Sequence, residues 1–178
     1  MWRDDQLTEL ASSVRADTVV AAVRLASPGA PIEESGNAPF VADGRWLFSL
    51  NGIIDGYREG IGDDLLALVS ERRRAGIEGE ADTETLFALV LDRLDAGRPM
   101  VEALVDVVAT VEARTTGRLN MILSEWGGAA ATAVGNSLFT NGPQLIASEP
   151  LDDDDDWHRV DDRSALMTDG SDLAVVAL

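Results

Sequence analysis

The stretch that decides the fold is Trp46-Leu47-Phe48-Ser49-Leu50-Asn51-Gly52-Ile53-Ile54-Asp55, an apolar run interrupted by Asn-Gly. Asn-Gly is the strongest short-range signal for a β-hairpin turn, because both residues tolerate positive φ. The run therefore predicts a strand over about residues 45–50 that turns at Asn51 and Gly52. The same pair sets a side-chain amide beside an unobstructed backbone N–H, and two such donors can stabilise an oxyanion. Most Asn-Gly pairs between strands are only turns, so the motif alone does not establish a site.

The composition is that of one globular domain with an acidic surface. Of the 178 residues, 46% are hydrophobic, which is enough apolar material for a core. The net charge is −18 and all 14 cationic residues are Arg. We expect no nucleic-acid partner, because phosphate binding requires a basic face.

The sequence also predicts no membrane partner. No apolar run approaches the roughly 18 residues that span a bilayer, and the N-terminal residues 1–5 lack the apolar core of a signal peptide. We therefore expect a cytoplasmic location. The sequence contains no Cys, which excludes disulfides, thiolate metal ligands and a cysteine nucleophile within these residues.

The hydrophobic pattern predicts strands, then helices, then strands. The apolar run over residues 18–24 is typical of a strand buried on both faces, and helices are predicted over residues 4–14, 63–74, 82–94 and 101–113. Short β-prone segments punctuated by turn residues then predict an antiparallel meander, over residues 119–123, 131–134, 137–140, 144–148, 164–167 and 173–176. This order predicts an α+β domain in which two sheets pack face to face with flanking helices.

Three groups of residues, taken in order along the chain, resemble a known family. Arg24 with Ser27 ends the first apolar strand, Asn51-Gly52 follows, and Asp82-Thr83-Glu84 opens a helix. In order and spacing they resemble the glutaminase domain of class II (N-terminal nucleophile) glutamine amidotransferases. Within that family the chain is most similar to the EgtC-type γ-glutamyl amidohydrolases of ergothioneine biosynthesis, over nearly its whole length. The segments that carry this similarity are Ala21-Ala22-Val23-Arg24, Pro31-Ile32-Glu33, Pro39-Phe40, Gly44 with Trp46-Leu47, Asn51-Gly52, Arg118-Leu119-Asn120-Met121-Ile122-Leu123 and Ala147-Ser148-Glu149-Pro150.

The resemblance implies a fold and a reaction. The implied fold is an αββα sandwich of two mainly antiparallel sheets flanked by helices, formed by a single glutamine amidotransferase type-2 domain over residues 1–178. The implied reaction is hydrolysis of γ-glutamyl-hercynylcysteine sulfoxide to glutamate and hercynylcysteine sulfoxide. The implied partner is this small-molecule γ-glutamyl substrate, and neither a metal nor an organic cofactor is implied.

The resemblance also implies roles for five residues. Arg24 would hold the substrate α-carboxylate in a bidentate fork with a further hydrogen bond from Ser27, and Asp82 would pair with the α-ammonium. The side-chain N–H of Asn51 and the backbone N–H of Gly52 would stabilise negative charge on the γ-carbonyl oxygen. Plainer alternatives stay open: Arg24 as a strand-end cation paired with any acidic residue, and Asp82 as a cap of its own helix.

Three charged features are assigned no active role. The carboxylates of the run Asp152 to Asp156 are consecutive, unlike those of an EF-hand loop, so this run is predicted to be a solvated loop and not a calcium site. His158 is the only His and offers a single candidate base for a Ser-His-Asp triad, which carries little weight. The run Arg72-Arg73-Arg74 is predicted to be a solvated helix end.

The nucleophile is the main departure from the family, and Leu50, where many amidotransferases have His before Asn-Gly, is a milder one. The family nucleophile is a Cys exposed as the N-terminal residue after Met is removed, with its own α-amine as base, whereas residue 2 here is Trp2. Three explanations compete: a start site assigned too late or a truncated chain, a homologue that binds γ-glutamyl ligands without turnover, or a catalytic half completed by a separate peptide. We favour the first, in which the N-terminal strands and the Cys are missing, because an uncovered sheet edge requires compensation.

The leading hypothesis from the sequence is therefore a γ-glutamyl amidohydrolase by descent, with this chain inactive as written. The alternatives are a non-catalytic homologue that binds γ-glutamyl compounds or glutamine, and the glutaminase component of another amidotransferase.

Overall fold

The computed structural model describes residue 9, residues 12–23 and residues 38–178. A six-stranded antiparallel sheet in the order β1-β2-β3-β4-β8-β9 is built from β1 (Phe40–Ala42), β2 (Trp46–Ile54), β3 (Gly117–Glu125), β4 (Gly128–Ala133), β8 (Ser164–Thr168) and β9 (Leu173–Ala177). A three-stranded sheet in the order β6-β5-β7 is built from β5 (Phe139–Asn141), β6 (Leu145–Ala147) and β7 (Trp157–Arg159). The helical elements are η2 (Tyr57–Glu59), α2 (Ile61–Leu66), α3 (Glu71–Arg74), α4 (Asp82–Asp95) and α5 (Met100–Glu112).

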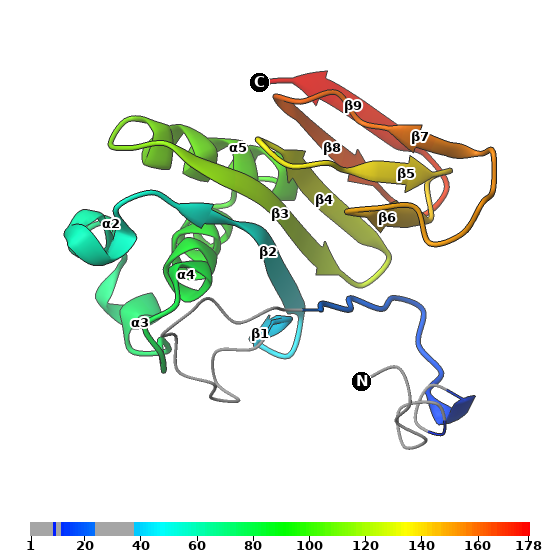
Figure 1. The fold of residues 1–178 in the computed structure, drawn as a ribbon. Helices are drawn as coiled ribbons and strands as arrows, with labels where there is room; N and C mark the ends of the chain where they lie inside the picture. Colours follow the sequence, from blue (N-terminus) through cyan, green and yellow to red (C-terminus); the bar gives the residue numbers. More distant parts are fainter. Residues whose placement is uncertain (1–8, 10–11, 24–37) are drawn as a thin grey trace.

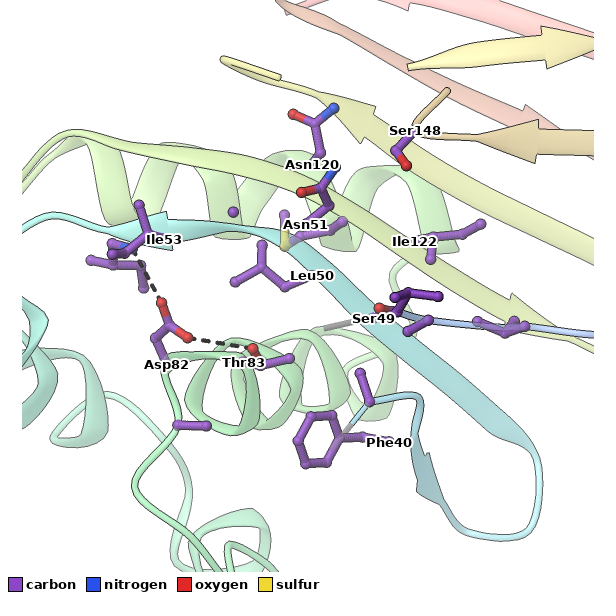
Figure 2. Close-up of a pocket in the computed structure, with 18 of the residues that line it drawn as sticks. Phe40, Ser49, Leu50, Asn51, Ile53, Asp82, Thr83, Asn120, Ile122 and Ser148 are labelled. Carbon is purple, nitrogen blue, oxygen red and sulfur yellow. Dashed lines mark hydrogen bonds between the residues drawn. The ribbon is translucent and has the colours of Figure 1, made fainter. Parts of the chain in front are cut away.

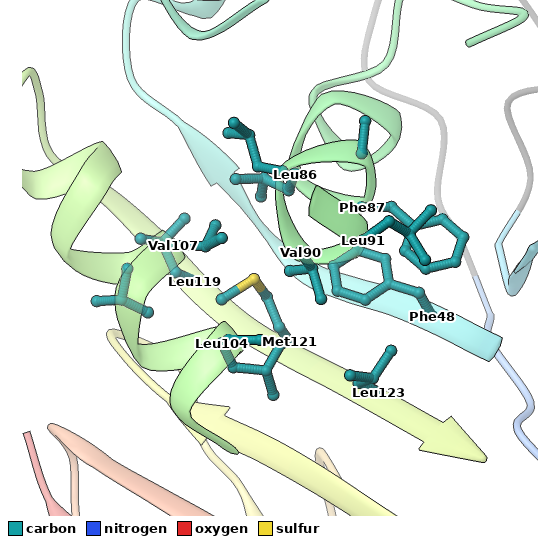
Figure 3. Packing of buried hydrophobic residues seen from close by; sticks show 14 of the residues in the cluster. Phe48, Leu86, Phe87, Val90, Leu91, Leu104, Val107, Leu119, Met121 and Leu123 are labelled. Atoms are coloured by element: carbon teal, nitrogen blue, oxygen red, sulfur yellow. The ribbon is translucent and has the colours of Figure 1, made fainter. Parts of the chain in front are cut away.

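The described elements form layers of helices, large sheet and small sheet (Figure 1). The main core lies between the large sheet and helices α4 and α5, where Phe48 of β2 stacks on Phe87 of α4 with ring centroids 4.9 Å apart (Figure 3). A smaller apolar cluster joins the two sheets and includes Ala131, Leu138 and Leu166. The predicted α+β class with two antiparallel sheets is confirmed.

Strand β2 contributes to both sides of the large sheet. Because successive side chains of a strand point to opposite faces, Phe48 and Ile54 enter the core under the helices while Ser49 and Asn51 face the other way. The same alternation in β3 sends Met121 into the core and Asn120 to the opposite face.

The Asn-Gly pair lies inside β2, so the predicted turn is wrong. Asn51 pairs with Asn120 of β3, Gly52 pairs with Leu119, and the ladder continues to Ile54. A Cβ added at Gly52 would lie 1.8 Å from the carbonyl oxygen of Arg118. Glycine is needed here because another backbone approaches closely, not because the chain reverses.

Two further predictions were wrong. The single helix predicted over residues 63–74 is two short helices, α2 and α3. Helix α2 ends at Leu66, and Ser70 caps the start of α3 because its Oγ accepts a hydrogen bond from the N–H of Arg73. The predicted buried strand over residues 18–24 does not form in residues 18–23, the part of this range that the structure describes. Residues 18–23 pair with no strand of the described chain, and most of them are exposed. An extended segment becomes a buried strand only when neighbours satisfy its backbone groups.

The remaining elements follow the sequence prediction more closely. Helices α4 and α5 occupy the predicted ranges, and each of the six β-prone segments after residue 118 contains a strand. They do not form one meander, because β4 pairs with β8 while the strands between them make the second sheet. None of the helices in the described residues has the length and apolar character needed to cross a bilayer.

Arg73 ties three elements together and is not the solvated residue expected from the sequence. Its side chain is 8% exposed, and its guanidinium donates hydrogen bonds to both carboxylate oxygens of Asp95 at 2.7 Å and to Asp43 at 2.8 Å. Asp95 ends α4 and Asp43 lies in the turn between β1 and β2. The hydrogen bonds to Asp95 raise the pKa of Arg73, and the bond from Arg73 lowers the pKa of Asp95.

The close approach at Gly52 predicts a large effect of a single methyl group. We expect Gly52→Ala to lower the free energy of unfolding by about 3 kcal/mol, because the Arg118 backbone cannot move without disturbing the β2–β3 ladder. Urea unfolding measures the change. The control Gly76→Ala, whose Cβ would meet nothing closer than the Arg73 carbonyl at 3.5 Å, should change stability by less than about 0.5 kcal/mol. Equal unfolding midpoints for the two variants would contradict the close approach.

The Arg73 cluster predicts a second stability difference and its pH dependence. We expect Arg73→Met to lower the free energy of unfolding by about 2 kcal/mol at pH 7, as measured by urea unfolding. This is less than the usual loss for a broken buried ion pair, because both carboxylates are partly exposed. The control Arg72→Met removes a 69% exposed side chain and should cost less than about 0.5 kcal/mol.

Because the pKa of Asp95 is depressed in the folded state, its contribution is fully present above the unfolded pKa of 3.8 and is lost as the pH falls through the folded pKa. The difference in free energy of unfolding between wild type and Arg73→Met should therefore decrease below pH 3.8. A gap that stays constant down to pH 2 would contradict the assignment.

Candidate active site

A cavity of about 730 Å³ runs along the outer edge of β2. It is lined by residues 19–23, 49–59, 80–83, 120–122 and 146–148, together with Ala38, Phe40 and Leu138. Figure 2 shows β2 and β3 forming its floor, with the start of α4 on one side and Ser148, next to β6, on the other. The cavity therefore reaches both faces of β2 around its edge.

The edge of β2 in this cavity is open. Strand β1 pairs only with residues 46–48, so β2 has no strand partner on this side beyond Phe48 in the described chain. The N–H of Ile54 points away from β3 at this edge and donates to Oδ2 of Asp82 at 3.2 Å. N–H direction alternates along a strand, so the N–H of Gly52 points to the same edge. Leu119, opposite Gly52, donates its own N–H to Val134 on the far side, as expected of a pair without mutual hydrogen bonds.

Asn51 reaches the cavity from the face of the sheet. Its side chain lies on the side of β2 toward the smaller sheet, and the Nδ2 of Asn136 donates to its carbonyl oxygen at 2.8 Å and to its Oδ1 at 3.4 Å. No described residue accepts a hydrogen bond from Nδ2 of Asn51, which leaves this donor available to a ligand. A side-chain N–H and a backbone N–H from consecutive residues thus meet one cavity.

Asp82 connects the start of α4 to the same edge. Its Oδ2 accepts from Ile54 and its Oδ1 accepts from the Thr83 hydroxyl at 3.3 Å. The carboxylate therefore bonds across to β2, while the loop before the helix is held by Glu84, whose Oε1 accepts the N–H groups of Glu78 and Gly79 at 3.0 and 3.1 Å. This division leaves the Asp82 carboxylate half-buried at the cavity wall.

Tyr57 fixes this wall from the η2 side. Its hydroxyl lies 2.6 Å from Oγ1 of Thr85 and also donates to the carbonyl of Ala81 at 3.5 Å. Burial raises the pKa of Tyr57, and the nearby carboxylates of Asp82 and Glu84 raise it further. The hydroxyl stays protonated at neutral pH and remains a donor that ties η2 to the start of α4.

The described cavity lining carries more negative than positive charge. Asp55, Glu59, Glu80 and Asp82 supply carboxylates, and Arg58 is the single cation among the described lining residues. Such a lining favours a cationic group such as an ammonium. No group of three or more His, Asp or Glu in the described residues is placed to hold a metal ion.

Three of the five predicted site residues line this one cavity: Asn51, Gly52 and Asp82. Asn51 and Asp82 approach from different sides of β2, with the Leu50 side chain between them (Figure 2). Arg24 and Ser27 lie outside the described residues.

Sequence reasoning missed Tyr57, Asn120 and Asn136. A signal existed for Asn120, a polar residue inside the apolar strand 119–123, but Asn136 follows Gly135 and reads only as a turn.

The acidic loop and His158 lie away from the cavity. Oδ1 of Asp152 accepts from the N–H of Asp154 and from Nε1 of Trp157, so the carboxylates serve the turns of their own loop. The ring Nδ1 of His158 lies 2.7 Å from the carbonyl oxygen of Asp156. Neither feature contributes to the cavity wall.

Two named relatives align with the whole chain. The gamma-glutamyl-hercynylcysteine sulfoxide hydrolase of Mycolicibacterium smegmatis is 34% identical over 182 residues, which covers 100% of this chain and 72% of that protein. The protein of the same name from Mycobacterium tuberculosis is 31% identical over 183 residues, with 100% and 70% covered. This chain belongs to their family. The resemblance to EgtC-type amidohydrolases is thereby confirmed, and the family is one of hydrolases related to glutamine amidotransferases.

Solved structures agree on the fold. A glutamine aminotransferase class-II domain protein from Silicibacter pomeroyi superposes with a TM-score of 0.70 at 21% identity, covering 99% of this chain and 81% of that one. Glutamine phosphoribosylpyrophosphate amidotransferase from B. subtilis gives a TM-score of 0.56 at 13% identity, covering 83% and 33%. No protein-family model matches the chain.

The two hydrogen bonds of Asp82 predict different effects of two substitutions. Asp82→Ala leaves the backbone N–H of Ile54 without its acceptor, and we expect a loss of about 1–2 kcal/mol in the free energy of unfolding. Asp82→Asn keeps a side-chain oxygen for that N–H and should stay within about 0.5 kcal/mol of wild type. Urea unfolding compares them, and equal losses for both variants would contradict the bond to β2.

Proposed function

We propose that this chain binds γ-glutamyl compounds in the cavity at the open edge of β2. The observation that carries the proposal is the open edge itself, where the N–H of Gly52 and the carboxylate of Asp82 meet one cavity beside the Asn51 amide. By analogy with the named relatives, we propose γ-glutamyl-hercynylcysteine sulfoxide as the substrate, and ergothioneine biosynthesis as its setting.

The charges of the cavity suit the amino-acid head of a glutamyl group. The α-ammonium pairs with Asp82, and the surplus of carboxylates in the described lining strengthens this preference. The α-carboxylate needs a cation in an otherwise acidic lining, and this is the role proposed for Arg24, with Ser27 adding a hydrogen bond. A bidentate guanidinium would fix the orientation of the head as well as its charge.

The oxyanion donors suit the other end of the glutamyl group. Hydrolysis adds water across the amide: oxygen joins the acyl carbon, the C–N bond breaks, and the amine leaves with a proton. Negative charge develops on the γ-carbonyl oxygen before the C–N bond breaks, and we assign its stabilisation to the Asn51 amide and the Gly52 N–H. Loss of one such donor typically lowers the rate by roughly 10²–10³.

Binding and turnover depend on different groups of the protein. The 178 residues contain no Cys, and the lining hydroxyls of Ser49, Thr83 and Ser148 have no imidazole partner among the described lining residues. We therefore propose that this chain retains the ligand contacts of its family but does not itself release glutamate. We also retain the cytoplasmic location as a proposal.

Calorimetric titration with L-glutamine tests the binding site. We expect wild-type binding, a loss of about tenfold in affinity for Asp82→Asn because an ion pair is replaced by a neutral contact, and a loss of similar size for Arg24→Ala. Asp82→Asn is informative because its fold is expected to be intact. The control Asp172→Asn alters an exposed carboxylate outside the cavity and should bind as wild type does. A wild-type chain that binds no glutamine would overturn the proposal.

Incubation with γ-L-glutamyl-p-nitroanilide tests turnover. We expect no release of p-nitroaniline above the rate without protein, because the chain lacks a thiol nucleophile. Release that scales with protein concentration and disappears in Asn51→Ala would show that another group attacks the carbonyl, and would refute the proposed inactivity.

A further inference from the structure

Three asparagines form a connected row between β3 and the cavity. Asn120 is the cross-strand partner of Asn51, and directly opposed residues of a ladder project to the same face of a sheet. Asn136 lies in the loop that follows β4 and donates to Asn51. The row therefore runs from Asn120 through Asn136 to Asn51.

Asn120 is the fixed end of this row. It is 4% exposed, and its amide uses both ends in hydrogen bonds to one loop. Oδ1 accepts the N–H groups of Val134 and Asn136 at 3.0 and 3.1 Å, and Nδ2 donates to the carbonyls of Asn136 and Ser137 at 3.1 and 3.0 Å. A buried amide satisfied in this way holds one orientation, because any rotation would leave polar groups unpaired.

The loop between residues 134 and 137 is held from its other side as well. The N–H of Gly135, at φ +84°, donates to Oδ1 of Asp162 at 2.8 Å. The hydroxyl of Ser137 donates to the carbonyl of Ser148 at 2.9 Å. The loop thus presents the Asn136 side chain to β2 from a set position.

The contact between Asn136 and Asn51 determines which end of the Asn51 amide faces the cavity. Nδ2 of Asn136 donates to the Asn51 carbonyl at 2.8 Å and to Oδ1 at 3.4 Å. An asparagine amide has one acceptor end and one donor end, so occupying Oδ1 leaves the NH₂ group as the end that a ligand meets. The reverse orientation would place Nδ2 of Asn51 against the NH₂ of Asn136, with two donors facing one another.

We propose that Asn136 is a positioning residue that orients the Asn51 amide donor toward the γ-carbonyl of the ligand, and that Asn120 holds Asn136 in place. The inference rests on the proposed γ-glutamyl site. It predicts that Asn136 contributes only to the recognition of a carbonyl and not to binding of the amino-acid head.

A pair of ligands separates these contributions. L-glutamine carries the carbonyl, whereas L-norvaline keeps the same head and methylene stem and ends in a methyl group. Calorimetric titration of wild type should show tighter binding of glutamine. For Asn136→Ala we expect glutamine affinity to fall about fivefold, the range of one lost neutral hydrogen bond, with norvaline affinity unchanged.

The near-isosteric variant Asn136→Asp gives a sharper result. The new carboxylate accepts a hydrogen bond from the side-chain NH₂ of Asn51, which turns Oδ1 of Asn51 toward the ligand in place of the NH₂ group. Glutamine affinity should therefore fall further than in Asn136→Ala. Matched controls are Asn141→Ala and Asn141→Asp, because Asn141 donates to Asp154 at 3.4 Å and does not line the cavity. Both controls should bind the two ligands as wild type does.

The double variant Asn51→Ala/Asn136→Ala should lose no more glutamine affinity than Asn51→Ala alone, since the two residues act through one donor.

The outcomes separate the proposed γ-glutamyl site from the proposed role of Asn136. Wild-type binding of neither ligand overturns the γ-glutamyl site, and the inference with it. Glutamine binding that is unchanged in both Asn136 variants, or that falls together with norvaline binding, overturns the positioning role alone. Should the variants fail to fold, side-chain amide NMR of ¹⁵N-labelled wild type decides. The Asn51 NH₂ signals should shift on addition of glutamine and not of norvaline, and equal shifts would overturn the inference.

Discussion

The register of β2 on β3 is the constraint on which the site depends. It runs from Leu47 opposite Ser124 to Ile54 opposite Gly117, and it passes Gly52 over the carbonyl of Arg118 at a distance that no Cβ permits. A slip of one residue would send Asn51 into the helix-covered core and bring Phe48 to the cavity face. The core therefore fixes the register, because Phe48, Met121 and their neighbours lose their burial in any other pairing. The position of the polar groups follows from the packing of the apolar ones.

The open edge of β2 is the second requirement. Strand β1 ends its pairing at Phe48, and the start of α4 replaces it by bringing a single acceptor, the Asp82 carboxylate, to the N–H of Ile54. One ladder position is thus satisfied by a side chain, and the neighbouring N–H, at Gly52, has no hydrogen-bond acceptor among the described residues. A longer β1 would have paired both N–H groups and removed the donor. The short strand and the helix start together leave this edge open, as the proposed binding of a γ-carbonyl requires.

The sequence predicted the two antiparallel sheets, and three of the five residues it proposed for a site line one cavity, but it did not predict the backbone that presents them. Helix α4 was readable because Leu86, Leu89 and Val90 recur at helical spacing. Gly52 was predicted to form a turn for a local reason, its tolerance of positive φ, whereas the structure requires glycine there for a non-local one, the close approach of the Arg118 carbonyl. Arg73 was misjudged for the same reason: its partners Asp43 and Asp95 come from elements that only the tertiary fold brings together. Asn136 has no local signal, because its position beside Asn51 depends on a loop fixed by Asn120 and Asp162.

The contacts that shape the cavity are independent of any nucleophile. Gly52 is placed by a backbone ladder, Asp82 by the N–H of Ile54 and the helix start, and Asn51 by the loop that Asn120 holds. Each of these supports lies in the described residues and none requires a thiol. The proposed site therefore has two separable parts, a rigid set of donors for the γ-glutamyl carbonyl and an attacking group that the donors do not help to position. The proposed recognition without turnover is consistent with these supports, because the donors are held by the same packing that stabilises the fold.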